Sequence, residues 1–278
     1  MKLKYFLIAI LFCSFSVRGQ QVTVGGSVNV MLPSGSTTIS QSTALSLLQQ
    51  KFPSDGYTNN LISSFPGYTY YNLNGNILRL SYKLFDGRGA FLTNEKTKID
   101  AIGTENSINT TIQKTSTITT FSNGNPTLLT YFTGGSVATY HFTCTNPYNT
   151  DILTGVLHFA VADKTTVTTM LNALLTTVYF IPRNVTFTMT NSSSSAVIVT
   201  FVNGPSNLTL TLQPGTTNST VQVLSGLYSV LTIKPAIPGS TVTRTMTLGT
   251  RAPVTAPGNA FSNVVISPGS SDLTLTVQ

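Results

Sequence analysis

The chain contains only two histidines, and their sequence positions suggest that they lie together. Each is flanked on both sides by apolar residues, in two segments predicted to be neighbouring strands. Because side chains alternate along a strand, both rings are expected on the polar face of the sheet. If Phe142 pairs with Leu157, His141 lies directly opposite His158, with Cβ atoms about 5 Å apart. Two imidazoles at that separation form a candidate transition-metal pair.

A functional metal site needs more than two ligands, together with groups that orient them. The sequence around His141 and His158 contains no His-x-x-x-His motif and no nearby carboxylate, and Asp151 lies too far along the connecting loop to be assumed a ligand. The simpler interpretation is a pair of solvent-facing histidines among threonines. No cofactor is predicted.

Tyrosines provide the best candidate for a recognition surface. They gather between residues 57 and 82, and we select Tyr57, Tyr68 and Tyr70 as candidate ligand-binding residues. Tyrosine rings stack on sugar faces or fill pockets of a partner at low entropic cost. Tyr68 and Tyr70 are expected on one face of a strand, with Tyr71 on the other. The alternative is that these rings pack in the core, and the absence of tryptophan argues against a dedicated carbohydrate module.

Other catalytic chemistry has little support in the sequence. The chain has eight acidic residues, and their spacing shows no pair that faces across a cleft as a glycosidase requires. There is no Gly-x-Ser-x-Gly motif, and Cys144 has the parity of an inward-facing core residue. We therefore predict that the protein is not an enzyme.

The first 19 residues have the features of a signal peptide. Lys2 and Lys4 precede an apolar run over residues 5–15, and small or β-branched residues follow before Gln20. The run is shorter than the roughly 20 residues that span a bilayer, and no later stretch could act as a transmembrane segment. The protein is expected to be exported to the cell surface or the extracellular space, with the periplasm as an alternative.

The residues from 20 to 182 are predicted to form an α+β domain, built as an antiparallel meander with two short amphipathic helices. Apolar residues at helical spacing indicate helices at about 43–51 and after Asp163. The dipeptide Asn74-Gly75 between two alternating segments predicts a hairpin, and Gly134-Gly135 predicts another. Residues around Phe91 and Ile99 are expected to be extended.

Beyond residue 182 the pattern changes, because helical periodicity disappears and short alternating segments recur about every ten residues. This spacing predicts an all-β, immunoglobulin-like antiparallel sandwich over residues 183–278.

Composition narrows the classes of function. Charged residues make up 8% of the chain, against about 25% in typical proteins. Without the three basic residues of the leader, the formal charge falls from +7 to +4, and the remaining basic residues are isolated, so no nucleic-acid partner is predicted. We expect a secreted or cell-surface, non-catalytic protein with a binding, attachment or structural role.

Its expected partner is a protein or glycan of the cell envelope, and an oligomer is compatible with the sequence. The alternatives are a carbohydrate-binding module of a bacterial surface system and a metal-assisted enzyme that uses His141 and His158.

Overall fold

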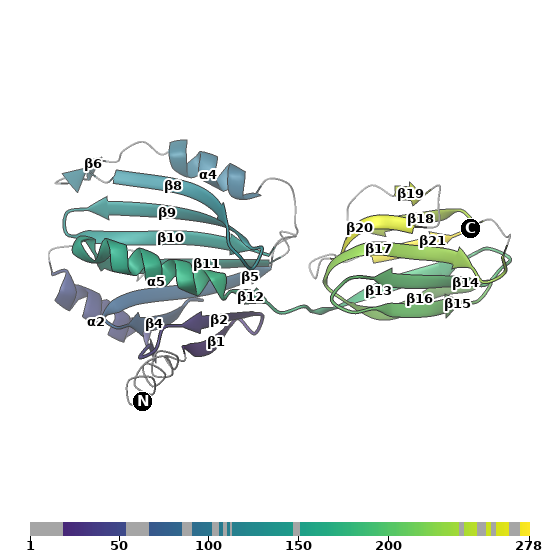
Figure 1. Ribbon diagram of the computed structural model, residues 1–278, viewed down its shortest axis with the longest axis horizontal. Helices are drawn as coiled ribbons and strands as arrows, with labels where there is room; N and C mark the ends of the chain where they lie inside the picture. The colour runs from purple at the N-terminus through teal and green to yellow at the C-terminus, as the bar shows by residue number, and fades with distance from the viewer. Residues whose placement is uncertain are drawn as a thin grey trace, which may run out of the picture. The chain divides into compact units, whose positions relative to one another are not determined.

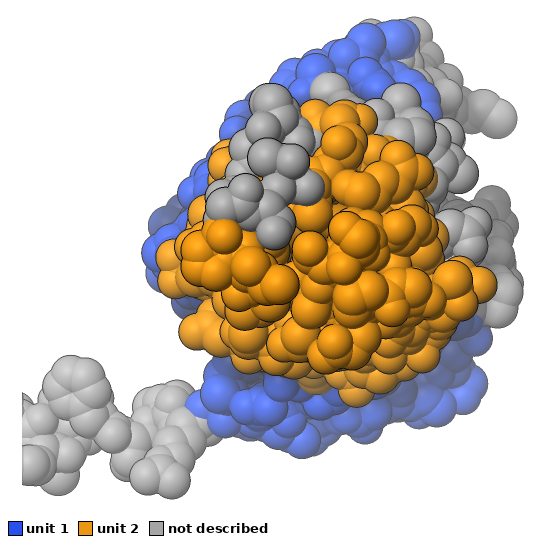
Figure 2. Space-filling model, turned by 90° about the vertical axis from the view of Figure 1, so that its right-hand side faces the viewer, with its two compact units in different colours: residues 1–83, 90–147, 152–180 blue, residues 84–89, 148–151, 181–278 orange. Residues whose placement is uncertain are grey.

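The structure is a computed structural model. It describes residues 19–53, 67–84, 91–101, 106–107, 110–111, 113–146, 151–238, 242–248, 254–256, 260–266 and 273–278. The predicted signal peptide therefore lies outside the described residues, apart from Gly19. The chain divides into two compact units, coloured separately in Figure 2. Unit 1 comprises residues 1–83, 90–147 and 152–180, and unit 2 comprises residues 84–89, 148–151 and 181–278.

Most of the described residues are in strands that form several sheets, an architecture compatible with a β-sandwich. No helix in the described ranges is long and apolar enough to span a membrane.

A seven-stranded sheet forms the centre of unit 1, with the strand order β3-β4-β5-β11-β10-β9-β8 (Figure 1). Its strands are β3 (Thr37–Ile39), β4 (Thr69–Leu73), β5 (Asn76–Leu84), β8 (Gln113–Thr120), β9 (Pro126–Gly134), β10 (Val137–Thr145) and β11 (Asp151–Ala160). A second sheet of three strands contains β1 (Gln20–Val24), β2 (Val28–Leu32) and β12 (Tyr179–Phe180). The short strands β6 (Asn106–Ser107) and β7 (Thr110–Thr111) pair separately.

Both predicted hairpins of unit 1 are confirmed. Strands β4 and β5 are joined by Asn74 and Gly75, which have φ angles of 53° and 88°. Positive φ at both positions is what a type I′ turn requires, and asparagine and glycine tolerate it best. Strands β9 and β10 pair across Gly135, where φ is 64°.

Three α-helices are described in unit 1, one more than the sequence predicted. The two expected ones are α2 (Gln41–Lys51) and α5 (Lys164–Thr176). Helix α2 begins where the side chain of Ser40 accepts a hydrogen bond from the Thr43 amide at 3.0 Å, which is a typical N-cap.

The prediction of extended structure around Phe91 and Ile99 was wrong, because both residues lie in helix α4 (Phe91–Ala101). Only Leu92 of this helix is buried, so its apolar periodicity is weak. Its regularity comes from charged pairs instead, since Lys96 contacts Asp100 four residues along and Lys98 contacts Glu95 three residues back.

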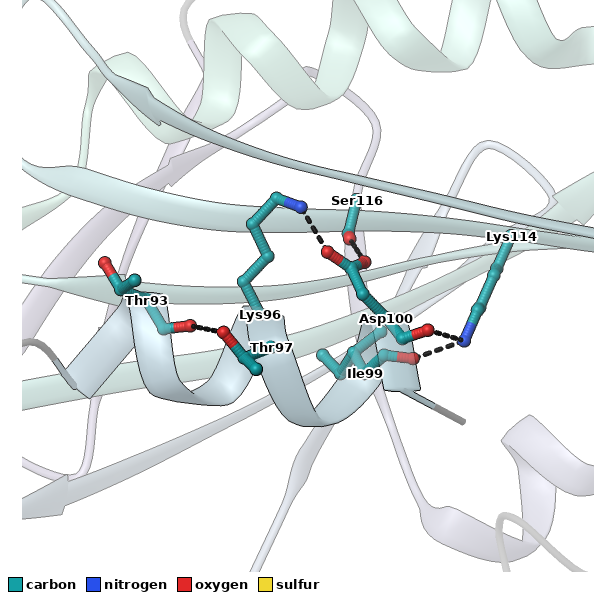
Figure 3. Close-up of polar contacts among 7 residues, drawn as sticks. All are labelled: Thr93, Lys96, Thr97, Ile99, Asp100, Lys114 and Ser116. Carbon is teal, nitrogen blue, oxygen red and sulfur yellow. Dashed lines mark hydrogen bonds and ion pairs between the residues drawn. The ribbon is translucent and has the colours of Figure 1, made fainter. Parts of the chain in front are cut away.

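Contacts to the edge strand β8 hold the C-terminal end of α4 in place (Figure 3). Lys114 donates to the last carbonyl groups of the helix, those of Ile99 and Asp100. Ser116 donates to the Asp100 carboxylate, which also accepts from Lys96. Hydrogen bonds from Lys96 and Ser116 lower the pKa of Asp100 below its usual value.

The seven-stranded sheet has two differently covered faces. On one face, the apolar side of α5 and residues of β1 and β2 pack against inward residues such as Leu80, Phe142 and Phe159 in the main core. On the other face, α2 packs near β4 and β5, where Ala44 and Leu48 contact Tyr70 and Ile77. Helix α4 lies against β8 on this second face as well. Ser116 of β8 is paired with Thr130 of β9, so the two side chains share a face, and the Ser116 hydroxyl donates to Asp100 of the helix.

Unit 2 contains two sheets that enclose a second apolar core. One sheet has the order β16-β13-β21-β18-β19 and the other β15-β14-β17-β20. The strands are β13 (Asn184–Asn191), β14 (Val197–Val202), β15 (Leu208–Leu212), β16 (Thr216–Leu224), β17 (Gly226–Pro235), β18 (Arg244–Leu248), β19 (Val254–Ala256), β20 (Ala260–Ile266) and β21 (Leu273–Val277). Apolar residues alternate inward from both sheets, including Phe187, Phe201 and Tyr228.

The prediction of a wholly antiparallel arrangement was wrong at one position. Strand β13 pairs in parallel with β21, with Phe187 opposite Leu273, while the other described pairs of unit 2 are antiparallel. A parallel pair joins strands that are far apart in sequence, and the period-two pattern of a single strand carries no information about its direction relative to a partner.

Candidate functional site

The second face of the seven-stranded sheet carries an unusual group of polar side chains on its central strands. Tyr70 of β4 is paired with Arg79 of β5, and His141 of β10 is paired with Thr130 of β9. His158 lies on β11, between β5 and β10. We call these five residues the Arg79 cluster.

The predicted face of the two histidines is right, but the predicted register and exposure are wrong. His158 lies opposite Thr139, and His141 lies opposite Val156, so the two histidines are diagonal rather than direct neighbours. The strands are shifted by two residues from the expected pairing, with Phe142 opposite Gly155 rather than Leu157. Gly155 leaves room for the large Phe142 ring, since a Cβ there would lie 2.1 Å from its Cζ atom.

The histidine rings are not solvent-facing. His158 is 1% exposed and His141 is half-buried, with its ring packed edge-on against Phe132 at 4.8 Å between centroids. Helices α2 and α4 pack on the same side of the sheet as the two histidines, against β4 and against β8. Alternation along the strands predicts the face, whereas its cover depends on elements far away in the sequence.

Burial and one positive charge set the protonation of both rings. Burial, together with a smaller contribution from the nearby Arg79 guanidinium, lowers the pKa of His141 to about 4. Burial likewise lowers the pKa of His158 to about 3, with smaller contributions from Arg79 and His141. Both imidazoles are therefore neutral at pH 7, and each has one N–H donor and one acceptor nitrogen.

Several polar atoms of the cluster lack hydrogen bonds. Within the part of the chain that the structure describes, neither Nδ1 nor Nε2 of His158 has a partner, nor does Nε2 of His141 or Oγ1 of Thr130. These atoms are shielded from solvent. Buried polar atoms are nearly always paired in folded proteins, so a group of unpaired ones requires an explanation such as a bound molecule or ion.

Two of the three predicted tyrosines belong to the same region. Tyr70 is 4% exposed, and burial raises the pKa of its hydroxyl, an effect that Arg79 partly offsets. Tyr68 is half-buried, and its ring lies 5.0 Å from the Arg79 guanidinium carbon, which is a cation–π contact. Tyr57 lies outside the described residues. The two residue sets that the sequence suggested separately, Tyr68 with Tyr70 and His141 with His158, thus lie on one face of the sheet, on either side of strand β5 with Arg79.

Sequence reasoning missed Arg79, which connects the two sets. In composition and spacing it is only one of the isolated basic residues of the chain. A usable signal was present, because Arg79 interrupts the apolar run Ile77-Leu78-Arg79-Leu80 in the middle of a strong strand. Arg79 is 3% exposed, and a buried guanidinium in such a run is retained only where it makes specific interactions.

Two kinds of chemistry find no support among the described residues of this region, metal binding and thiol chemistry. Among the described residues, no group of three or more His, Cys, Asp or Glu side chains is placed to hold a metal ion. The positive charge of Arg79 that lowers the pKa of both imidazoles would also repel a cation. Cys144 faces the main core on the opposite side of the sheet, where burial raises the pKa of its thiol to about 12.

Comparisons with known proteins add no family to this description. A scan against protein-family models finds no match, and a search of curated proteins finds no relative.

Proposed function

We propose that the chain is an exported, non-catalytic protein of the cell surface that binds or attaches to an envelope component. In this proposal, an α+β domain over residues 20–182 holds a ligand, and an immunoglobulin-like sandwich over residues 183–278 serves attachment. The observation that carries it is a set of solvent-shielded polar atoms within the Arg79 cluster, namely Oγ1 of Thr130, Nε2 of His141 and both ring nitrogens of His158, which lack hydrogen-bond partners in the described structure. Such a cluster costs folding free energy, and that cost is explained if the cluster interacts with a bound molecule.

The outer face of the five-stranded sheet in unit 2 supports an attachment role. Threonines are paired across three adjacent strands in two rows. One row contains Thr188, Thr274 and Thr247, and the other contains Thr190, Thr276 and Thr245. This face is neutral and rich in hydroxyl groups, which suits an uncharged polar partner better than a nucleic acid or an anionic surface.

A tyrosine in unit 2 supports the immunoglobulin-like assignment. The hydroxyl of Tyr228 donates to the carbonyl of Leu224, four residues upstream, at 2.9 Å. A buried tyrosine whose hydroxyl bonds back to the upstream main chain is a hallmark of Greek-key sandwiches.

A carbohydrate ligand is the second candidate, and Tyr68 is the residue that favours it. Its ring is half-buried beside the cluster, so part of it can contact a ligand. The metal-assisted enzyme that uses His141 and His158 has less support, because of the repulsion from Arg79 described above.

Retention by an envelope fraction and by a glycan panel tests the proposal. The chain beginning at Gln20 is compared with Tyr68→Ala and with Tyr179→Ala, a control in which an equally large ring that is 57% exposed is removed elsewhere in unit 1. We expect binding by the unmodified chain and the control, and weaker binding by Tyr68→Ala. A chain that stays free in every fraction would overturn the proposal.

A further inference from the structure

A glutamine stands at the start of the exported chain. Val17 and Gly19 occupy the two positions that a signal peptidase reads before its cleavage site, which places the cut between Gly19 and Gln20. Gln20 is followed by Gln21, so a cut one residue later exposes a glutamine as well. In both cases the terminal amino group belongs to a glutamine.

An N-terminal glutamine holds a nucleophile and an electrophile in one residue. The α-amino nitrogen attacks the side-chain amide carbon Cδ, which closes a five-membered lactam. The bond from Cδ to the side-chain nitrogen breaks, and that nitrogen leaves as ammonia with the proton that the attacking nitrogen loses. An α-amino group has a pKa of about 7.7–8.0, so roughly a tenth of it is neutral and nucleophilic at pH 7. Because both groups belong to one residue, the reaction needs no encounter between two molecules.

The structure leaves the Gln20 side chain in a position where it can react. Gln20 is the first residue of β1, and its main chain pairs with Leu32 of β2. The side chains of Gln20 and Gln21 are both exposed. An exposed amide can turn back to the terminal nitrogen without losing any contact with the core.

Strand β1 needs protection from trimming more than an ordinary chain end does. It lies at the edge of its three-stranded sheet, and it is the terminal element of the exported chain, where proteolysis concentrates. The strand nevertheless contributes to the main core of unit 1, because Val24 is buried and Val22 packs against that core. A chain that begins at Gln20 has a single cysteine, so no intramolecular disulfide can replace these contacts.

We propose that Gln20 of the exported chain cyclises to pyroglutamate and that the lactam protects β1 from aminopeptidases. The inference rests on the proposed export, which creates the free amino group. Cyclisation removes the primary amine that aminopeptidases recognise. It also removes the terminal positive charge.

Mass spectrometry of the exported protein tests the modification. The full chain is produced with its own leader in an exporting host, and the intact protein and its N-terminal peptide are measured. We expect a mass lower by one ammonia than that of a chain with an open terminal glutamine, with the loss confined to the N-terminal peptide. An exported chain that begins at an open Gln20 or Gln21, or at any other residue, would overturn the inference and leave the proposed export intact.

A matched variant tests the protective role of the ring. In Gln20→Asn with Gln21→Asn, both side chains keep an amide but are one methylene shorter, so the same attack would close only a strained four-membered ring. This variant and the unmodified chain are released from a fusion protein so that each begins at residue 20. Both are held at neutral pH and then treated with an aminopeptidase. We expect the unmodified chain to lose ammonia and keep β1, and the variant to lose residues from β1. Equal trimming or equal resistance of the two chains would overturn the protective role.

The released chain also separates this inference from the proposed function. A full chain that stays inside the cell with its leader attached would overturn the proposed export. The chemistry of Gln20 is then decided by the released chain alone, in which ring closure supports the reactivity of Gln20 and an open terminus refutes it.

Discussion

Acid should destabilise unit 1 because two buried histidines must remain neutral in the folded state. In the unfolded chain, each histidine has a pKa of about 6.5. In the folded protein, the pKa values are lowered to about 4 for His141 and about 3 for His158. The folded state therefore binds fewer protons than the unfolded state between these limits. Unit 1 therefore keeps its full stability above about pH 6.5. It loses stability as the pH falls from there toward the pKa values that the two histidines have in the folded protein.

The size of the effect follows from the two shifts. At pH 4.5, about two pH units below the unfolded pKa, each histidine favours the unfolded chain by about 2 to 3 kcal/mol, since one unit corresponds to 1.36 kcal/mol. The two histidines together lower the free energy of unfolding by about 5 kcal/mol between pH 7 and pH 4.5. A domain is stable by about 5–15 kcal/mol in total, so unit 1 should lose a large part of its stability in this range.

Cys144 provides a probe that reports on unit 1 alone. It is fully buried in the main core of that unit, and it is the only cysteine of the chain that begins at Gln20. Its reaction with 4,4′-dithiodipyridine, which remains reactive in acid, is followed in urea at several pH values. We expect the urea midpoint for exposure of the thiol to fall steeply between pH 6.5 and pH 4.5.

The variant His158→Leu separates the two contributions. It removes one titrating ring and two unpaired buried nitrogen atoms, so it should raise the stability of unit 1 at pH 7 and remove about half of the acid loss. The reasoning would be refuted by a midpoint that does not change between pH 7 and pH 4.5, or by an acid loss in His158→Leu as large as in the unmodified chain. Loss of ligand binding in a variant that is more stable would in addition mark the cluster as functional.

Three further predictions concern packing and buried hydrogen bonds. Gly155→Ala should destabilise unit 1 by about 1–3 kcal/mol, because a Cβ would lie 2.1 Å from the Phe142 ring, and Cys144 exposure in urea measures it. Asn191→Ala should cost unit 2 about 2–3 kcal/mol, because the Asn191 amide donates to three main-chain carbonyls that would lose this partner. Tyr228→Phe should cost unit 2 about 1 kcal/mol by removing the bond to the Leu224 carbonyl. Hydrogen exchange of peptides from β13 and β17 measures both changes in unit 2.

Local chemistry was readable from the sequence where neighbouring residues decide the structure. The Asn74-Gly75 turn is such a case, because the two residues are of the types that tolerate the positive φ angles the turn requires, so they specify it without help from distant residues. Helix α2 is another, since its apolar spacing and its cap at Ser40 lie within one short segment. Helix α4 was missed because it buries only Leu92, and its charged pairs stabilise it without a clear apolar stripe.

The candidate site was only half predictable for a related reason. Alternation predicted that His141 and His158 share a face, and that Tyr68 and Tyr70 share a face. It carried no information that β5 lies next to β11, which brings Arg79 beside both histidines. Neighbouring strands that are far apart in sequence are chosen by the packing of the whole core, and no local pattern records that choice.

The sequence by itself determined the strand-rich composition, the tight turns, two helices and the faces of the histidines and tyrosines, because each depends on residues within a few positions of one another. Only the tertiary structure decided the register of β10 on β11, the parallel pair β13–β21 and the burial of polar atoms of His141 and His158. These features depend on long-range contacts, whose free energy is shared by many residues rather than encoded in any one segment. The Arg79 cluster exists only where those contacts place it.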